Sequence, residues 1–157
     1  MGGMIHPYSA NSFFCPIGNT MLCYGENTRY QLILYDFDGN VKSVMDRDEK
    51  PRSISSKEKK FLGKNCVFPS HRPFFKKLMS DDKGRIYAIR VKSVWDENKA
   101  EKADIFSRHG RYLYRTEFPA TPSLIKNDSV YFIDEGQDGL KVIKRVKIRN
   151  YLQMKEE

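Results

Sequence analysis

The chain has 157 residues, of which 39% are hydrophobic, 31% charged and 13% aromatic, and its net charge is +8. This length and balance fit one globular domain with its own core, and they exclude a disordered or collagen-like protein. No window approaches the roughly 18 consecutive apolar residues of a transmembrane helix, and the first ten residues lack the basic and apolar segments of a secretory signal. We expect a cytoplasmic protein if the chain is complete, and a periplasmic or extracellular one if it is part of a longer exported protein.

The positive charge invites comparison with proteins that bind nucleic acids or anionic surfaces. The basic residues are dispersed, however. Glu58 interrupts the run from Lys57 to Lys60, and apolar residues alternate with cations between Lys141 and Arg149. A solvated basic face is therefore favoured, and nucleic-acid binding is kept as an alternative.

Residues 12–48 predict four strands in succession. The segments SFFCPI and TMLCYG flank a turn at Gly18. The next segment, YQLILYDF, is apolar on both alternating faces, which predicts a strand covered on both sides. Asp38-Gly39-Asn40 then predicts a tight hairpin turn into a fourth strand, because Gly and Asn accept positive φ at little cost.

Residues 53–73 are predicted as a helical insertion followed by a connector. Ser55 and Glu58 have the spacing of a capping box, and Gly63 supplies a stop signal, so a short helix is expected between them. Pro69 and Pro73 prevent a helix in the connector.

Residues 74–118 predict a second set of four strands, and residues 122–150 an incomplete third set of three. His109-Gly110-Arg111 repeats the part that Asp38-Gly39-Asn40 plays in the first set. No strand is expected after Asn150. Four antiparallel strands repeated with buried faces are typical of propeller blades, whereas a β-sandwich would explain the strands but not their repeated order.

Four segments carry a resemblance to a known family: HRPFFKKLMSDDKGRIYAIRV, DIFSRHGRYLYRTEFP, LILYDFDGNVK and GLKVIKRVKIRN. They resemble the NHL-like six-bladed β-propellers of TolB-like architecture, many of which are uncharacterised bacterial proteins. The resemblance implies an all-β fold, a partial six-bladed propeller with blades at 12–48, 74–118 and, incomplete, 122–150. It implies no catalytic motif, since similar architectures include binding proteins, lactonase-like enzymes and RNA-binding modules.

The chain is too short for a closed propeller. About three units leave two apolar blade faces without a neighbour, and such faces are expected to find a partner. We therefore expect either a fragment of a longer protein or a homodimer that completes the ring.

The residue types that carry metal or catalytic chemistry are scattered. The histidines are far apart in the sequence, and the Asp residues near glycines are expected to form turns rather than a calcium site. Cys15 and Cys23 are predicted as buried free thiols. No catalytic residue, metal ligand or cofactor is predicted.

The candidate ligand-binding residues are Arg72, Lys76 and Arg90. They lie in or near strands that would converge on a propeller axis, where they could form a basic mouth for a carboxylate or phosphate. The alternative is that Arg72 pairs with an acid of the neighbouring blade.

The expected function is a non-enzymatic binding or interaction scaffold that takes a protein or a small anionic ligand on its loop face. The alternatives are a propeller-type hydrolase or lyase with an axial metal, and an RNA-binding propeller with a basic face.

Overall fold

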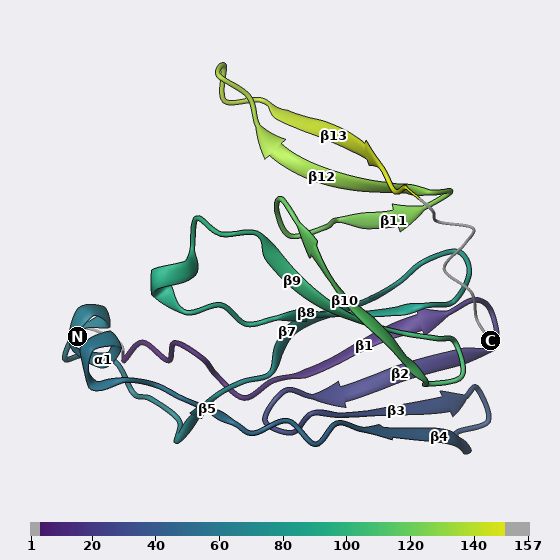
Figure 1. The fold of residues 1–157 in the computed structure, drawn as a ribbon, viewed down its shortest axis with the longest axis horizontal. Coiled ribbons are helices and arrows are strands. Elements are labelled where there is room, and N and C mark those ends of the chain that lie inside the picture. Colours follow the sequence, from purple (N-terminus) through teal and green to yellow (C-terminus); the bar gives the residue numbers. More distant parts are fainter. Residues whose placement is uncertain (1–3, 150–157) are drawn as a thin grey trace.

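The structure is a computed structural model that describes residues 4–149, and it consists mainly of antiparallel β-sheets with one α-helix (Figure 1). The predicted all-β class is confirmed. In the described part of the chain no sheet closes on itself.

The first two sheets are four-stranded meanders in which each strand pairs with the next in sequence. The first sheet contains β1 (Ser12–Ile17), β2 (Met21–Glu26), β3 (Gln31–Asp36) and β4 (Val41–Asp46). The second contains β7 (Phe75–Ser80), β8 (Ile86–Arg90), β9 (Glu101–Phe106) and β10 (Tyr112–Phe118).

The third sheet has three strands, as expected, namely β11 (Leu124–Lys126), β12 (Ser129–Glu135) and β13 (Lys141–Lys147). The segment from Asn150 onward, where no strand was expected, lies outside the described residues. A two-stranded sheet that the sequence did not predict joins β5 (Arg52–Ser53) to β6 (His71–Arg72). A 3-10 turn, Val94–Asp96, follows β8, and the Ser93 hydroxyl accepts a hydrogen bond from its backbone at Trp95.

The two glycine turns form as predicted. Gly39 and Gly110 have φ values of 85° and 93°, a region that side chains with a Cβ avoid. Gly110 is also closely packed, because a Cβ there would lie 2.8 Å from the Met45 side chain. Around Gly39 no heavy atom lies that close.

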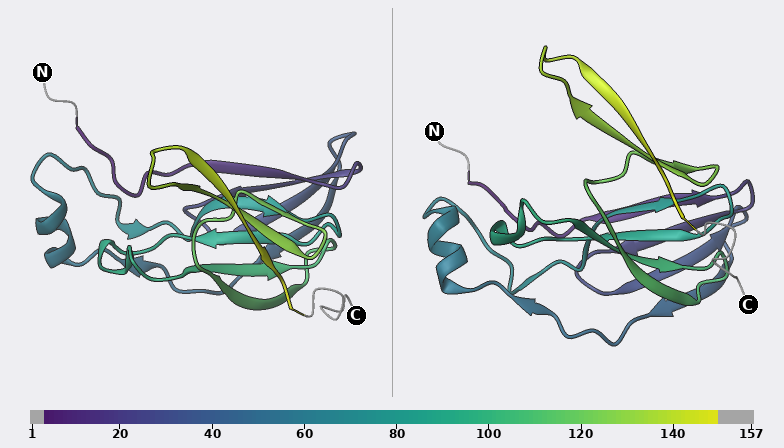
Figure 2. Two further views of the ribbon diagram at one scale, coloured as in Figure 1. Left: turned by 90° about the horizontal axis from the view of Figure 1, so that it is seen from above. Right: turned by 45° about the horizontal axis from the view of Figure 1, so that its top comes forward.

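The predicted helix is confirmed as α1 (Ser56–Leu62), with Ser55 as its N-cap and Gly63 as its C-cap. The Ser55 side chain accepts a hydrogen bond from the Glu58 backbone, which is half of a capping box. The Glu58 carboxylate is instead buried and directed toward other parts of the chain. α1 lies at one end of the molecule, beyond the ends of the sheets (Figures 1 and 2).

The core consists of two clusters, one on each face of the second sheet. Ile86 and Ala88 of β8 pack toward the first sheet, whereas Tyr87 and Ile89 pack toward the third. β8 is therefore buried on both faces, and the three sheets form successive layers (Figure 2).

The outer faces of the first and third sheets stay partly uncovered. The expectation that β3 is covered on both sides is wrong for the described chain, since Leu32 and Leu34 are buried but Ile33 and Tyr35 are only half-buried. Directly paired residues share a face, so Ile33 forms an apolar row with neighbours on all four strands. That row is Phe14, Tyr24, Ile33 and Val44. On the third sheet, Leu124, Ile133, Val142, Ile143 and Val146 are exposed apolar residues.

Candidate functional site

Arg72, the first of the predicted ligand-binding residues, is buried and paired with an acid. Its Nη2 donates to Glu58 Oε2 at 2.6 Å. The other Glu58 oxygen accepts from the Tyr8 hydroxyl at 2.6 Å and from the Ser93 hydroxyl at 3.2 Å. Arg72 therefore pairs with an acid, but this acid comes from α1 and not from a neighbouring blade, as the alternative had expected.

These contacts stabilise the charged form of Glu58. Burial by itself raises the pKa of this carboxyl, but the hydrogen bonds from Tyr8 and Arg72 outweigh burial and lower the pKa below its ordinary value of 4.5. Burial and the neighbouring Glu58 raise the pKa of Tyr8 to about 12. The cluster therefore holds α1 and the start of the chain against β6 with fixed charges.

Arg90, at the end of β8, belongs to a second buried network. Its Nη1 donates to Asp104 Oδ2 and to Glu49 Oε2, both at 2.8 Å. Asp104 also accepts from Arg115 Nε at 2.8 Å and from the Tyr30 hydroxyl. Burial raises the pKa of Asp104, but the hydrogen bonds from Arg115, Tyr30 and Arg90 lower it overall. This network joins the first sheet to the second.

Lys76, on β7, pairs with Glu101 at 2.9 Å, and Lys92 reaches the same carboxylate oxygen at 3.1 Å. Burial raises the pKa of Glu101, but these two ammonium groups lower it overall. Each of the three predicted residues thus lies beside a carboxylate. The structure does not bring their charged groups together in one mouth.

A cavity of about 120 Å³ lies between β5 and the loop that joins β8 to β9. Its charged lining consists of Arg52, Arg90, Lys92, Lys99, Lys102 and Asp96. The one carboxylate in this set is 2.7 Å from Lys99. We refer to this cavity as the cationic pocket. Of the predicted residues, Arg90 lines it directly, and Lys76 is connected to it through Glu101 and Lys92.

Arg52 is the residue of the pocket that has no acid partner in residues 4–149. Its Nη2 donates to the Val91 carbonyl at 3.1 Å, and its Nε is buried with no hydrogen-bond partner among the described residues. Burial, followed by the nearby Arg90 and Arg72, lowers its pKa. An arginine stays charged in proteins, so Arg52 adds a positive charge to the pocket lining, and it has one donor that is unused within the described chain.

The sequence carried no signal for Arg52. Its position follows from β5, a strand of two residues in which Arg52 pairs with Arg72. So short a strand has no periodicity that a pattern could reveal. Arg72, which pairs with Arg52 across β5 and β6, was the predicted site residue closest to it in the sheet.

Other chemistry-bearing residues have structural positions. Asp81 accepts hydrogen bonds from the backbone of Lys83 and Arg85, which confirms its predicted role in a turn. Cys15 and Cys23 are buried, free and directly paired across β1 and β2, as predicted for buried thiols. In residues 4–149, no group of three or more His, Cys, Asp or Glu side chains could hold a metal ion. No α-helix in this range has the length and apolar character needed to cross a membrane.

No protein-family model matches the chain, and no curated protein matches it either. Among solved structures, it is similar to the crystal structure of a protein of unknown function from Bacteroides caccae, with 8% sequence identity and a TM-score of 0.31. The match covers 90% of this chain and 62% of that protein, so the chain spans less than two thirds of the length of its structural neighbour. The resemblance to NHL-like propellers stays a prediction, and the comparisons place the chain in no family.

Proposed function

We propose that this chain is a non-enzymatic binding scaffold that takes a small anionic ligand, a carboxylate or a phosphate, in the cationic pocket. The observation that carries the proposal is Arg52, whose buried Nε lacks a partner in the described chain. An unsatisfied buried donor costs free energy, and a ligand oxygen would remove this cost. Guanidinium groups are suited to this task because their donors match the geometry of carboxylate and phosphate oxygens.

The charge balance of the pocket supports the same ligand class. Arg90 is neutralised by Glu49 and Asp104, and Lys92 by Glu101. Arg52 adds a charge that no carboxylate within ion-pair distance balances among the described residues. A small anion would complete the set, whereas a cation would meet repulsion.

We propose in addition that the three sheets are blades of a partial six-bladed β-propeller of the NHL-like, TolB-like type. The proposal is supported by the meander order of the first two sheets and by the core clusters that pack each sheet on the next. The first strands also approach one another, since the Ser80 hydroxyl of β7 donates to the Pro16 carbonyl of β1. Radially arranged blades require such an approach of their innermost strands.

The uncovered outer faces support an interaction with a second copy of the chain. Phe14 is 69% exposed on the first sheet, and Ile143 is 70% exposed on the third. Packing of one face on the other between two chains would bury both and complete a ring. Sedimentation should then give a dimer at micromolar concentration, and Phe14→Lys should shift it to monomer. A monomer at every concentration would contradict this arrangement.

Titration calorimetry with inorganic phosphate and with citrate tests the anion pocket. Arg52→Met keeps most of the side-chain length but removes the charge and the donors, and it should weaken binding at least tenfold, about 1.4 kcal/mol. Arg29→Met is the matched control, because Arg29 is exposed at the turn between β2 and β3. It should leave affinity unchanged.

Two results would overturn the proposed function. One is the absence of binding by either anion at millimolar concentration, and the other is equal binding by wild type and Arg52→Met. The hydrolase or lyase with an axial metal and the RNA-binding propeller remain alternative hypotheses, and RNA binding would have to weaken steeply with added salt.

A further inference from the structure

A group of exposed aromatic and basic side chains lies at the α1 end of the molecule, and none of them lines the cationic pocket. We call it the aromatic-lysine patch and define it by Phe61, Trp95, Lys57, Lys60 and Lys64. We propose that this patch docks the protein on an anionic lipid surface.

The aromatic part of the patch combines two separate segments. Phe61 of α1 and Trp95 of the 3-10 turn are 65% and 47% exposed, and their ring centroids are 4.7 Å apart. The rings thus form one apolar surface that the described chain leaves open to solvent. Nearby, Ile5 is 61% exposed and bridges to Cys66 just beyond the helix.

The charge around these rings is positive and little compensated. Lys57 Nζ lies 5.7 Å from the centroid of the Trp95 ring. Lys60 of α1 and Lys64, just beyond the end of the helix, are exposed. The one acid of α1, Glu58, is buried and paired with Arg72, so it does not balance these lysines.

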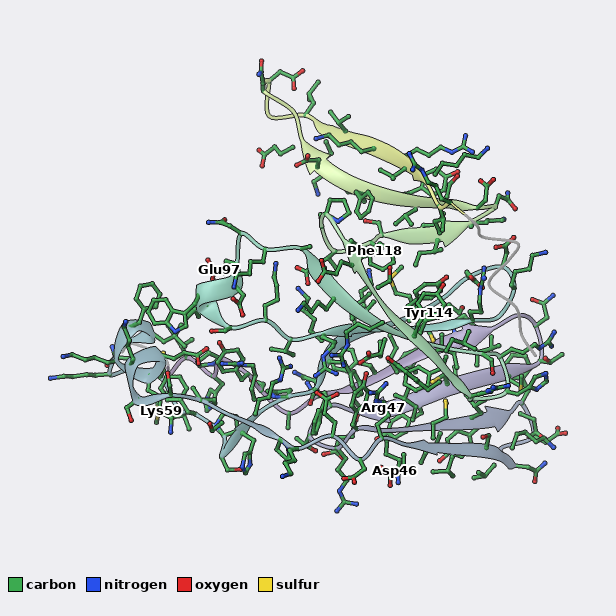
Figure 3. All side chains as sticks on the ribbon, in the orientation of Figure 1. Asp46, Arg47, Lys59, Glu97, Tyr114 and Phe118 are labelled. Carbon is green, nitrogen blue, oxygen red and sulfur yellow. The ribbon has the colours of Figure 1, made fainter. Side chains whose placement is uncertain are left out.

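Asp96, which follows Trp95 in the 3-10 turn, is paired with Lys99 at 2.7 Å. Glu97, on the same loop, lies at this end of the molecule, as does Lys59 of α1 (Figure 3). It is one carboxylate against several lysines, so the patch keeps a net positive charge.

This combination fits a lipid surface better than a protein groove. Tryptophan, whose ring has a polar edge, and lysines with long apolar stems are side chains that settle at the boundary between headgroups and acyl chains, and Phe61 adds apolar surface beside Trp95. Anionic headgroups attract such lysines over about a Debye length. The patch also lies at an end of the long axis, where α1 extends beyond the sheets and can approach a flat surface (Figures 1 and 2).

The chain offers a built-in probe, because Trp95 is its single tryptophan. Full-length protein is titrated with vesicles of phosphatidylcholine alone and with vesicles that also contain phosphatidylglycerol. We expect the Trp95 emission to shift to shorter wavelength with the anionic vesicles only, and to return when salt is added. Vesicle flotation measures the bound fraction independently.

Two sets of variants locate the binding surface. Phe61→Asp, and separately Lys57→Glu with Lys60→Glu and Lys64→Glu, should abolish the shift and the flotation. The control carries the same charge change on β13, with Lys141→Glu, Lys144→Glu and Lys147→Glu, and should keep most of the binding. Arg52→Met should also retain it, which separates the patch from phosphate capture in the pocket. Because the substituted patch residues are exposed, each variant should keep the thermal midpoint of the wild type, and this measurement verifies that it is folded.

Several results would overturn the proposal. These are no shift or flotation with anionic vesicles, equal binding to neutral vesicles, and equal loss in the β13 control. If polyglutamate shifts the Trp95 emission and vesicles do not, the surface serves an acidic protein instead. If Arg52→Met lost vesicle binding while the patch variants kept it, the lipid contact would lie in the cationic pocket and not in the patch.

Discussion

Asp104 and Arg52 are two charges withdrawn from solvent, and their surroundings differ. Asp104 is fully buried and receives hydrogen bonds from Tyr30, Arg90 and Arg115. Arg52 contacts a backbone carbonyl and keeps an unused donor within the described chain. The first arrangement is complete without a ligand, so its role is to join the sheets. The arrangement around Arg52 leaves one donor without a partner in the described chain, so a ligand that accepts a hydrogen bond there would gain binding free energy.

Removing the Asp104 charge should have the largest effect. Asp104→Asn leaves the buried Arg90 with one anion fewer, and breaking such a buried network costs about 3–5 kcal/mol. Denaturant unfolding measures the loss. Asp46→Asn on the exposed edge of the first sheet is the control and should change stability by less than about 0.5 kcal/mol. Equal stabilities of the two variants would contradict the structural role of the network.

The Glu58 cluster should make stability depend on acid pH. The pKa of Glu58 is lowered in the folded protein, so its contribution is present above pH 4.5 and is lost as the pH falls through the folded-state pKa. Glu58→Gln should therefore be less stable than wild type at pH 7, by about 1–3 kcal/mol for a disrupted buried hydrogen-bonded group. The difference should shrink at acid pH. A constant difference from pH 7 to pH 3 would show that charge is not its source.

Arg52 should behave in the opposite way to Asp104. Arg52→Met removes an unpaired charge from a half-buried position, so we expect a stability within about 1 kcal/mol of wild type, in either direction. Added phosphate should raise the thermal midpoint of wild type by mass action but leave that of the variant unchanged. A large loss of stability in the absence of phosphate would show that Arg52, like Asp104, stabilises the fold and does not serve as a ligand-binding residue.

The smallest effect is expected at the exposed rim of the pocket. Lys99 is 74% exposed and pairs with Asp96, and exposed pairs contribute less than about 1 kcal/mol. Lys99→Gln should thus leave unfolding almost unchanged and reduce phosphate affinity by less than Arg52→Met does. If Lys99→Gln lost more phosphate affinity than Arg52→Met, the main contact to the anion would be Lys99 at the rim and not Arg52.

Much of the fold could be predicted because its signals are local. The cap at Ser55 and the turn glycines Gly39 and Gly110 depend on residues close in sequence, and each forms as expected. The end of β8 at Arg90 is less local, since Ser93 caps the 3-10 turn that follows the strand. This boundary depends on a side-chain hydrogen bond that strand periodicity does not reveal.

The site was less predictable because it depends on distant partners. The sequence identified Arg72, Lys76 and Arg90 as basic residues near converging strands, but not the acids beside them. Lys76 meets an acid 25 residues away, and Arg90 meets one that is 41 residues away. Arg52 reaches the pocket only because the connector returns to pair β5 with β6.

The succession of meanders also has a consequence for how the chain folds. Every strand in the three main sheets pairs with its neighbour in sequence, so each sheet can form by closing short hairpin loops. Among the described residues, the strand pairings outside these sheets are the β5–β6 pair and the bridge from Ile5 to Cys66, which join residues farther apart in the sequence. We therefore expect the sheets to form early and the α1 end to dock late.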